Sequence, residues 1–282
     1  MGQPDAEPHH GLMENHRRRK VKTGKICLML ALLVLFSLES VGPTLSNADS
    51  PIRQHQAGGN SVQQHTRLDQ QNFGPIDSPA ALSPKWRSGR IDTTGGAEYL
   101  TDAEAAIIIE INMVRTDPAA YASNFLEPLR AYYRGRLLQY PGEIAIQTNE
   151  GIRALDECIR ALETSSPLSP LVPNKGLTLA ARDHANDQAR TGQTGHTGSD
   201  GSSPFIRMNR YGKWNALAGE NLGYGNSQAR KIVTSLLIDD GVTSRGHRKN
   251  LLDRSFNFIG TAVGPHMVYR SMCVIDLAES YN

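Results

Sequence analysis

The sequence predicts an α+β domain in which helices come first and a β-hairpin closes the chain. Apolar residues recur at helical spacing in several segments between 101 and 239. Two segments of strand composition follow, at 258–263 and 272–277. Strands and helices do not alternate as they do in βαβ units. This order favours helices packed against an antiparallel hairpin over a parallel sheet.

The helices are predicted from their starting signals and apolar stripes. Thr101 and Glu104 form a capping-box pattern at the start of the first helix. Asp117-Pro118 marks a second start, because proline is tolerated at the first helical position. Three further helices are expected at 148–164, 177–190 and 228–239.

The remaining segments of the domain are expected to be loops and turns. Glycine, serine and threonine dominate 191–203, which indicates a loop. Gly264-Pro265-His266 begins the turn of the closing hairpin, where His266 is expected to be exposed.

The N-terminal end predicts export. A basic cluster precedes an apolar run at 26–38, and these 13 residues are fewer than the roughly 20 that a membrane-spanning helix needs. This pattern is typical of a secretory signal peptide, here 1–48 with cleavage after Ala48. We therefore expect a secreted, extracellular protein. The alternative is an uncleaved anchor with the domain facing outward.

Composition divides the rest of the chain in two. Residues 49–97 are rich in Gln, Ser and Gly without apolar periodicity, which predicts a disordered linker. Residues 98–282 then form one domain of ordinary size.

The formal net charge of +2, without a basic face, argues against a nucleic-acid partner. Cys158 and Cys273 are the cysteines of this domain, and the sequence leaves open whether they pair.

Three polar segments carry the candidate site residues. His196 lies between glycines, Glu220 follows Gly219, and His247 follows Gly246. Two imidazoles and one carboxylate on glycine-bounded loops predict a shared cleft that holds Zn²⁺ or another divalent cation. Taken singly, each residue is a weak signal, a lone histidine of this kind is more often structural than functional, and the spacings match no compact ligand motif. No G-x-S-x-G motif supports a serine nucleophile.

A fourth ligand is expected from one of two adjacent aspartates that follow the 228–239 helical pattern. We assign Asp240 to the metal site together with His196, Glu220 and His247. Whether Asp239 takes that place instead stays open, because either carboxylate could orient an imidazole.

In combination, these segments resemble the CAP superfamily, the SCP-like domain of cysteine-rich secretory proteins, antigen 5 and pathogenesis-related proteins, in its bacterial-type form. The resemblance rests on Gly195-His196-Thr197-Gly198, Gly219-Glu220-Asn221 and Gly246-His247-Arg248, and it extends to 112–118. It implies a three-layer α-β-α sandwich with a small antiparallel sheet and a central cleft. Two histidines and two acidic residues line that cleft in many members and hold a divalent cation, often zinc.

The chain departs from this family pattern at two places. The second glutamate of the family has no direct counterpart, and Asp239 and Asp240 occupy its region. The stretch 128–175 exceeds the compact members, and its role is open.

The resemblance implies no single activity, so three functions remain open. The first is a secreted binding module whose cleft takes a cation and a sterol, a lipid, another small ligand or an extracellular protein. The second is a metal-dependent, peptidase-like hydrolase with Glu220 as the base. The third is a surface domain carried on the linker. The sequence does not decide whether the protein is an enzyme.

Overall fold

The computed structural model describes residues 12–15, 83–87 and 89–282. The predicted signal peptide, except for 12–15, and residues 49–82 of the predicted linker lie outside the described residues. Within the described part, no helix has the length and apolar character that crossing a membrane requires. The helices are α1 (Pro84–Arg87), α2 (Asp102–Thr116), α3 (Pro118–Tyr121), α4 (Ile152–Glu163), α5 (Lys175–Thr191), α6 (Pro204–Met208), α7 (Ala229–Ile238) and α8 (Gly246–Leu251).

Two sheets are built from the strands β1 (Leu12–Asn15), β2 (Tyr133–Arg134), β3 (Leu137–Leu138), β4 (Ile146–Gln147), β5 (Val172–Pro173), β6 (Trp214–Tyr224), β7 (Phe258–His266) and β8 (Arg270–Tyr281). The larger sheet has the order β1-β6-β8-β7-β5, and the smaller has the order β2-β3-β4. In the larger sheet β5 pairs with β7 in parallel, and the other pairings are antiparallel. The predicted hairpin is confirmed as β7–β8, whereas β6 was not predicted as a strand.

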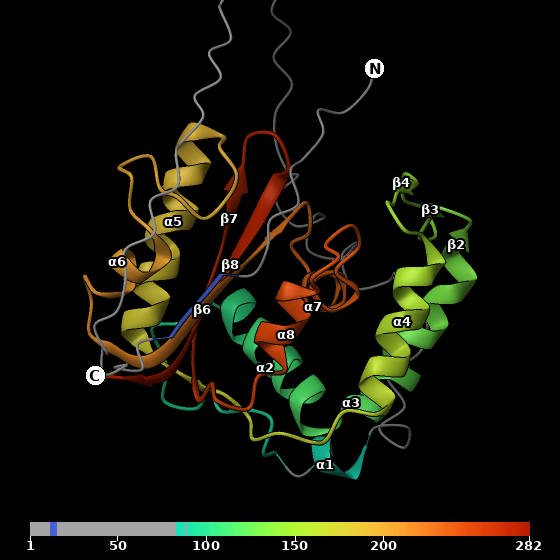
Figure 1. Ribbon diagram of the computed structural model, residues 1–282, viewed down its shortest axis with the longest axis horizontal. Helices are drawn as coiled ribbons and strands as arrows, with labels where there is room; N and C mark the ends of the chain where they lie inside the picture. Colours follow the sequence, from blue (N-terminus) through green and yellow to red (C-terminus); the bar gives the residue numbers. More distant parts are fainter. Residues whose placement is uncertain (1–11, 16–82, 88) are drawn as a thin grey trace, which may run out of the picture. The chain divides into compact units, whose positions relative to one another are not determined.

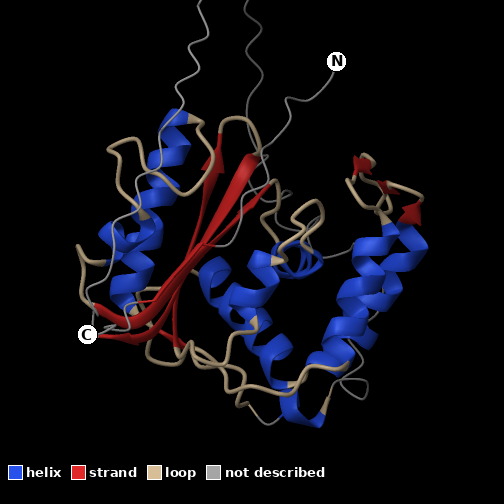
Figure 2. Cartoon of the chain, in the orientation of Figure 1, coloured by secondary structure: helices blue, strands red, loops and turns tan. Residues whose placement is uncertain are grey.

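Helices cover both faces of the larger sheet, which confirms the expected α-β-α arrangement. Helices α5 and α6 lie on one face, and α2, α7 and α8 lie on the other (Figure 1). Coloured by secondary structure, the sheet separates the two groups of helices (Figure 2). The predicted helix starts are also confirmed: Thr101 and Glu104 form the capping box, and Pro118 opens α3.

The face of the sheet beneath α5 alternates between apolar and polar rows. Glu220, Asp276 and Gly260 lie directly opposite one another on β6, β8 and β7 and so share one face. This row is flanked by two buried apolar clusters, one with Leu177, Ala180, Ala218 and Ala278 and the other with Ala181, Ala185, Leu222 and Val274. A Cβ at Gly260 would lie 2.2 Å from backbone atoms of Leu177 and Thr178. The missing side chain therefore lets α5 approach the sheet closely.

The 112–118 segment has a structural role in the described structure. The fully buried Asn112 side chain donates to the carbonyls of Ile91 and Leu171 and accepts from the Leu171 amide. The Arg115 guanidinium donates to four carbonyl oxygens, those of Ser169, Leu251, Asp253 and Phe256. Burial lowers the pKa of Arg115 to about 10. These two side chains hold the connections around α2 in place.

The folded domain begins before residue 98, which corrects the predicted linker boundary. The Trp86 side chain is 5% exposed, and its indole nitrogen donates to the Met113 carbonyl at 3.0 Å. The Thr93 hydroxyl donates to the Leu171 carbonyl. Residues 83–87 and 89–97 carry few apolar side chains, so their attachment through single side chains leaves no periodic signal in the sequence.

The structure also shows the state of the two cysteines and the exposure of His266. Cys158 and Cys273 are buried and unpaired. His266 is 2% exposed, so the expectation of an exposed turn residue is wrong. Its ring nitrogens lie within hydrogen-bond distance of the Gln193 carbonyl and the amides of Val268 and Tyr269.

Candidate functional site

Glu220 lies at the centre of a buried ionic cluster on the α5 face. It is fully buried on β6, so the loop predicted around it is wrong. Its Oε1 lies 2.7 Å from His196 Nδ1, and its Oε2 accepts from Arg207 Nη2 at 2.7 Å. Arg207 also donates to the carbonyls of His196 and Ser202. The arginine therefore fixes both the carboxylate and the loop that carries His196.

Asp276 on β8 is the direct cross-strand neighbour of Glu220 and is also fully buried. Burial and the neighbouring Glu220 charge raise the pKa of Asp276 well above its usual value. Burial also opposes ionisation of Glu220, but the His196 hydrogen bond and the Arg207 charge outweigh it and lower the Glu220 pKa. The pair thus holds one carboxylate, Glu220, and one neutral carboxylic acid, Asp276.

We expect the Asp276→Asn variant to gain stability relative to the natural protein as pH rises. The folded state of the natural protein keeps a proton that the unfolded state loses, so its stability falls by up to about 1.4 kcal/mol per pH unit between the unfolded and folded pKa values. Urea unfolding at pH 5 and pH 8 measures the difference. Glu220→Gln is the control, because the stabilisation from a carboxylate with a lowered pKa is already complete above its unfolded pKa, so the effect of this variant should be nearly the same at pH 5 and pH 8. Equal effects of Asp276→Asn at both pH values would contradict the assigned protonation.

His184 on α5 lies next to this buried ionic cluster. It is fully buried, and its Nε2 lies 2.8 Å from the Gly195 carbonyl oxygen. Gln188 donates to the same oxygen and thereby fixes the start of the His196 loop. Burial lowers the pKa of His184, which favours its neutral form. His184 is therefore a hydrogen-bonded histidine of the core.

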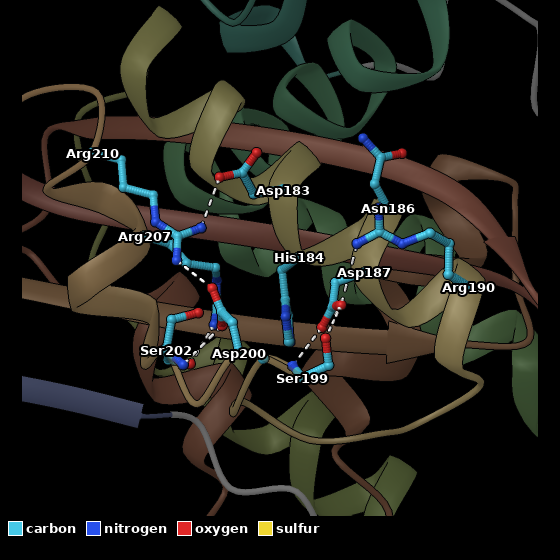
Figure 3. A pocket seen from close by; sticks show the side chains of 11 residues that line it. Asp183, His184, Asn186, Asp187, Arg190, Ser199, Asp200, Ser202, Arg207 and Arg210 are labelled. Carbon is cyan, nitrogen blue, oxygen red and sulfur yellow. Dashed lines mark hydrogen bonds and ion pairs between the residues drawn. The ribbon is translucent and has the colours of Figure 1, made fainter.

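A pocket of about 290 Å³ opens beside α5 (Figure 3). Its charged lining comprises Asp183, Asp187, Asp200, Arg190, Arg207 and Arg210. Arg210 joins Asp183 and Asp200, and Asp187 accepts from the backbone and hydroxyl of Ser199. The acidic groups of the pocket are therefore already bound within the protein.

The second predicted histidine belongs to a separate pair. Asp239 ends α7 in the left-handed region, with φ of 56°. Its carboxylate accepts from the His247 amide at 2.9 Å and lies 2.6 Å from His247 Nδ1. The buried Nε2 of His247 has no hydrogen-bond partner within the described residues. His247 lies on helix α8, not on a loop.

Asp240, which we assigned to the metal site, does not contact His247. Its carboxylate accepts from the backbone amides of Asn149 at 2.6 Å and Glu150 at 2.7 Å. Of the two aspartates, Asp239 therefore contacts the imidazole, whereas Asp240 binds the backbone of the two residues that precede Gly151 at the start of α4. The left-handed backbone at Asp239 turns the two side chains in different directions.

The two histidine–carboxylate pairs lie on opposite faces of the sheet. Successive strand residues point to opposite faces, so Glu220 faces α5 while Asn221 faces α8. The Asn221 amide donates to the His247 carbonyl at 3.0 Å, which places His247 on that second face. Among the residues that the structure describes, no group of three or more His, Cys, Asp or Glu side chains could hold a metal ion. Among these residues, no such cluster joins His196 and Glu220 to His247 and Asp240, and a cation site there stays a prediction.

Sequence reasoning missed Arg207 and Asp276. Asp276 stands alone as a charged residue in the apolar run 272–277, and this could have marked it as a buried titratable group. Arg207 lies in the short helix α6 among apolar residues, without a motif. Its pairing with Glu220 depends on the tertiary fold.

Comparison with known proteins assigns this chain to a family. A family model described as "CAP: Cysteine-rich secretory protein family" matches residues 110–275, more than half of the chain. The chain therefore belongs to the CAP family of cysteine-rich secretory proteins. The uncharacterised protein YkwD of Bacillus subtilis (strain 168) is 30% identical over 104 residues, which cover 37% of this chain and 38% of YkwD. The match thus spans under two fifths of this relative.

Two solved structures show more distant similarity. An extracellular SCP-domain protein from Bacillus anthracis is 22% identical with a TM-score of 0.34, covering 56% of this chain and 50% of that one. An outer surface protein from Borrelia burgdorferi is 19% identical with a TM-score of 0.33, covering 39% of this chain and 78% of that one. The family assignment rests on the sequence match.

Proposed function

We propose that this protein is an extracellular, non-enzymatic binding module of the CAP family. One observation carries the proposal: the two histidine–carboxylate pairs lie on opposite faces of the sheet. Each imidazole has a carboxylate partner of its own, Glu220 for His196 and Asp239 for His247. The Glu220 carboxylate is also bound through both oxygens, to His196 and Arg207.

The thiols of the described domain give further support. Burial raises the pKa of Cys158 to about 11 and raises that of Cys273 as well. A nucleophilic cysteine needs a lowered pKa and access to solvent. Neither thiol meets these conditions.

The hydrolase alternative is tested by turnover. We expect the full chain to release no product from a peptide and ester library, with or without added zinc. Turnover that is abolished both by a chelator and by Glu220→Gln would overturn the non-enzymatic proposal.

Zinc binding tests the separation of the two pairs. Because His196 and His247 lie on opposite faces, we expect no zinc-binding event that requires both of them. Calorimetric zinc titrations of His196→Ala, His247→Ala and the double variant should therefore show independent effects or none. If each single variant abolished the same binding event, the two imidazoles would share one ion and the separation would be wrong.

The extracellular location is supported by the basic cluster and the short apolar run at 26–38. Mass spectrometry of the mature N-terminus tests it. A new N-terminus near Ala48 supports release, whereas an intact N-terminus in the membrane fraction supports the anchored alternative.

A further inference from the structure

A second cavity, of about 380 Å³, is lined by none of the four residues of the two histidine–carboxylate pairs. Four tyrosines contribute to its wall: Tyr133, Tyr140, Tyr224 and Tyr269. They come from the 128–148 segment, from the end of β6 and from the turn between β7 and β8. The volume lies within the range of about 300–1,000 Å³ that is typical of small-molecule sites. We call this cavity the tyrosine pocket.

The charged groups of the tyrosine pocket are already compensated by other groups of the protein. Lys231 forms an ion pair with Glu143, and its ammonium lies 4.8 Å from the centre of the Tyr140 ring. Asp240 accepts two backbone hydrogen bonds. A charged ligand would have to compete with these partners, so the pocket favours a neutral one.

Three polar groups of the wall remain available to a ligand. The Asn226 side-chain amide and the hydroxyls of Tyr133 and Tyr269 form no hydrogen bond within the described part of the chain. Polar groups that lack a partner within the protein favour ligands that form hydrogen bonds with them. They lie on three different segments and would contact several ligand groups at once.

We propose that the tyrosine pocket binds a neutral saccharide unit. Tyrosine rings provide apolar faces for the C–H side of a sugar ring, and the amide and hydroxyls pair with its hydroxyl groups. Several separate polar contacts suit a polyhydroxylated ring better than a phenol with a single hydroxyl. This assignment rests on the proposed binding function and gives part of the 128–175 stretch, whose role was open, the function of a pocket wall.

The test uses the full chain and saturation-transfer NMR with glucose, N-acetylglucosamine and the charged analogue glucuronate. We expect the neutral sugars to bind and glucuronate to bind more weakly. Asn226→Ala and Tyr269→Phe each remove one available group and should weaken binding about 2- to 10-fold, the equivalent of one hydrogen bond. Tyr211→Phe, outside the pocket, is the matched control and should leave the affinity unchanged.

Three results would overturn the assignment: no binding of either neutral sugar, equal binding of glucuronate, or unchanged affinity in both pocket variants. Thermal unfolding of each variant separates loss of binding from loss of fold. A failure here leaves the non-enzymatic proposal intact, because turnover of the peptide and ester library tests that proposal separately. Comparing a free monosaccharide with a soluble oligosaccharide of the same unit distinguishes a free sugar from a glycan chain as the source.

Discussion

Arg207→Met should lower the free energy of unfolding by about 3–5 kcal/mol, the usual cost of removing one partner of a buried ion pair. The Arg207 side chain is 2% exposed and the Glu220 side chain is fully buried, so solvent cannot replace the lost partner. The methionine fills similar space but leaves Glu220 with His196 alone. The carbonyls of His196 and Ser202 also lose their donor. We expect the His196 loop to loosen along with the loss of stability.

Urea unfolding at pH 7 measures this effect, and hydrogen exchange of the 195–203 amides reports on the loop. Arg210→Met is the matched control, because its side chain is 38% exposed in the same pocket and its removal should have a much smaller effect. The double variant with Glu220→Gln should recover part of the loss, because it removes the unpaired charge. Equal losses in Arg207→Met and Arg210→Met would contradict the importance of the buried pair.

Gly260→Ala should destabilise the domain by more than about 3 kcal/mol, beyond the usual cost of overpacking. The added Cβ would lie 2.2 Å from the Leu177 carbonyl carbon and the Thr178 amide nitrogen. Both are backbone atoms of α5 and cannot move aside as a flexible side chain could. The helix must therefore shift away from the sheet, and the buried Glu220–Asp276 row beneath it would be opened.

Gly264→Ala provides the control on the same face of β7. Its Cβ would meet the Ala185 Cβ at 3.6 Å, which is ordinary van der Waals contact. We expect a change within about 1 kcal/mol there. Thermal and urea unfolding of both variants measure the difference. If Gly260→Ala were as stable as Gly264→Ala, the close seating of α5 would be wrong.

The parts of the fold that the sequence predicted are those with local signals. The capping box at Thr101 and the proline at 118 act within one helical turn, so neighbouring residues suffice to recognise them. The closing hairpin likewise joins two strands across a short turn. The family resemblance, carried by three short motifs, supplied the layered arrangement that local patterns do not determine.

Strand β6 could not be recognised in the same way. It is buried on both faces, so apolar and polar residues do not alternate along it. Its ladder to β8 has an irregularity between Asn215 and Ala218, and Ala216 has φ of 66°. Glu220 and Asn221 are both fully buried, and their partners come from distant segments.

The sequence identified individual residues of the candidate site but did not predict how these residues are arranged around the sheet. His196 and Glu220 do pair, and His247 does have a carboxylate partner, although that partner is Asp239. What the motifs could not show is on which side of the sheet each pair lies. That depends on the register of β6, in which a shift of one residue exchanges the two faces.

The absence of a bridge between Cys158 and Cys273 bears on how this protein responds to a reductant. Within the part of the chain that the structure describes, packing, hydrogen bonds and ion pairs hold the domain together without a disulfide. The stability of the domain should therefore be the same with and without a reductant, which urea unfolding under both conditions measures.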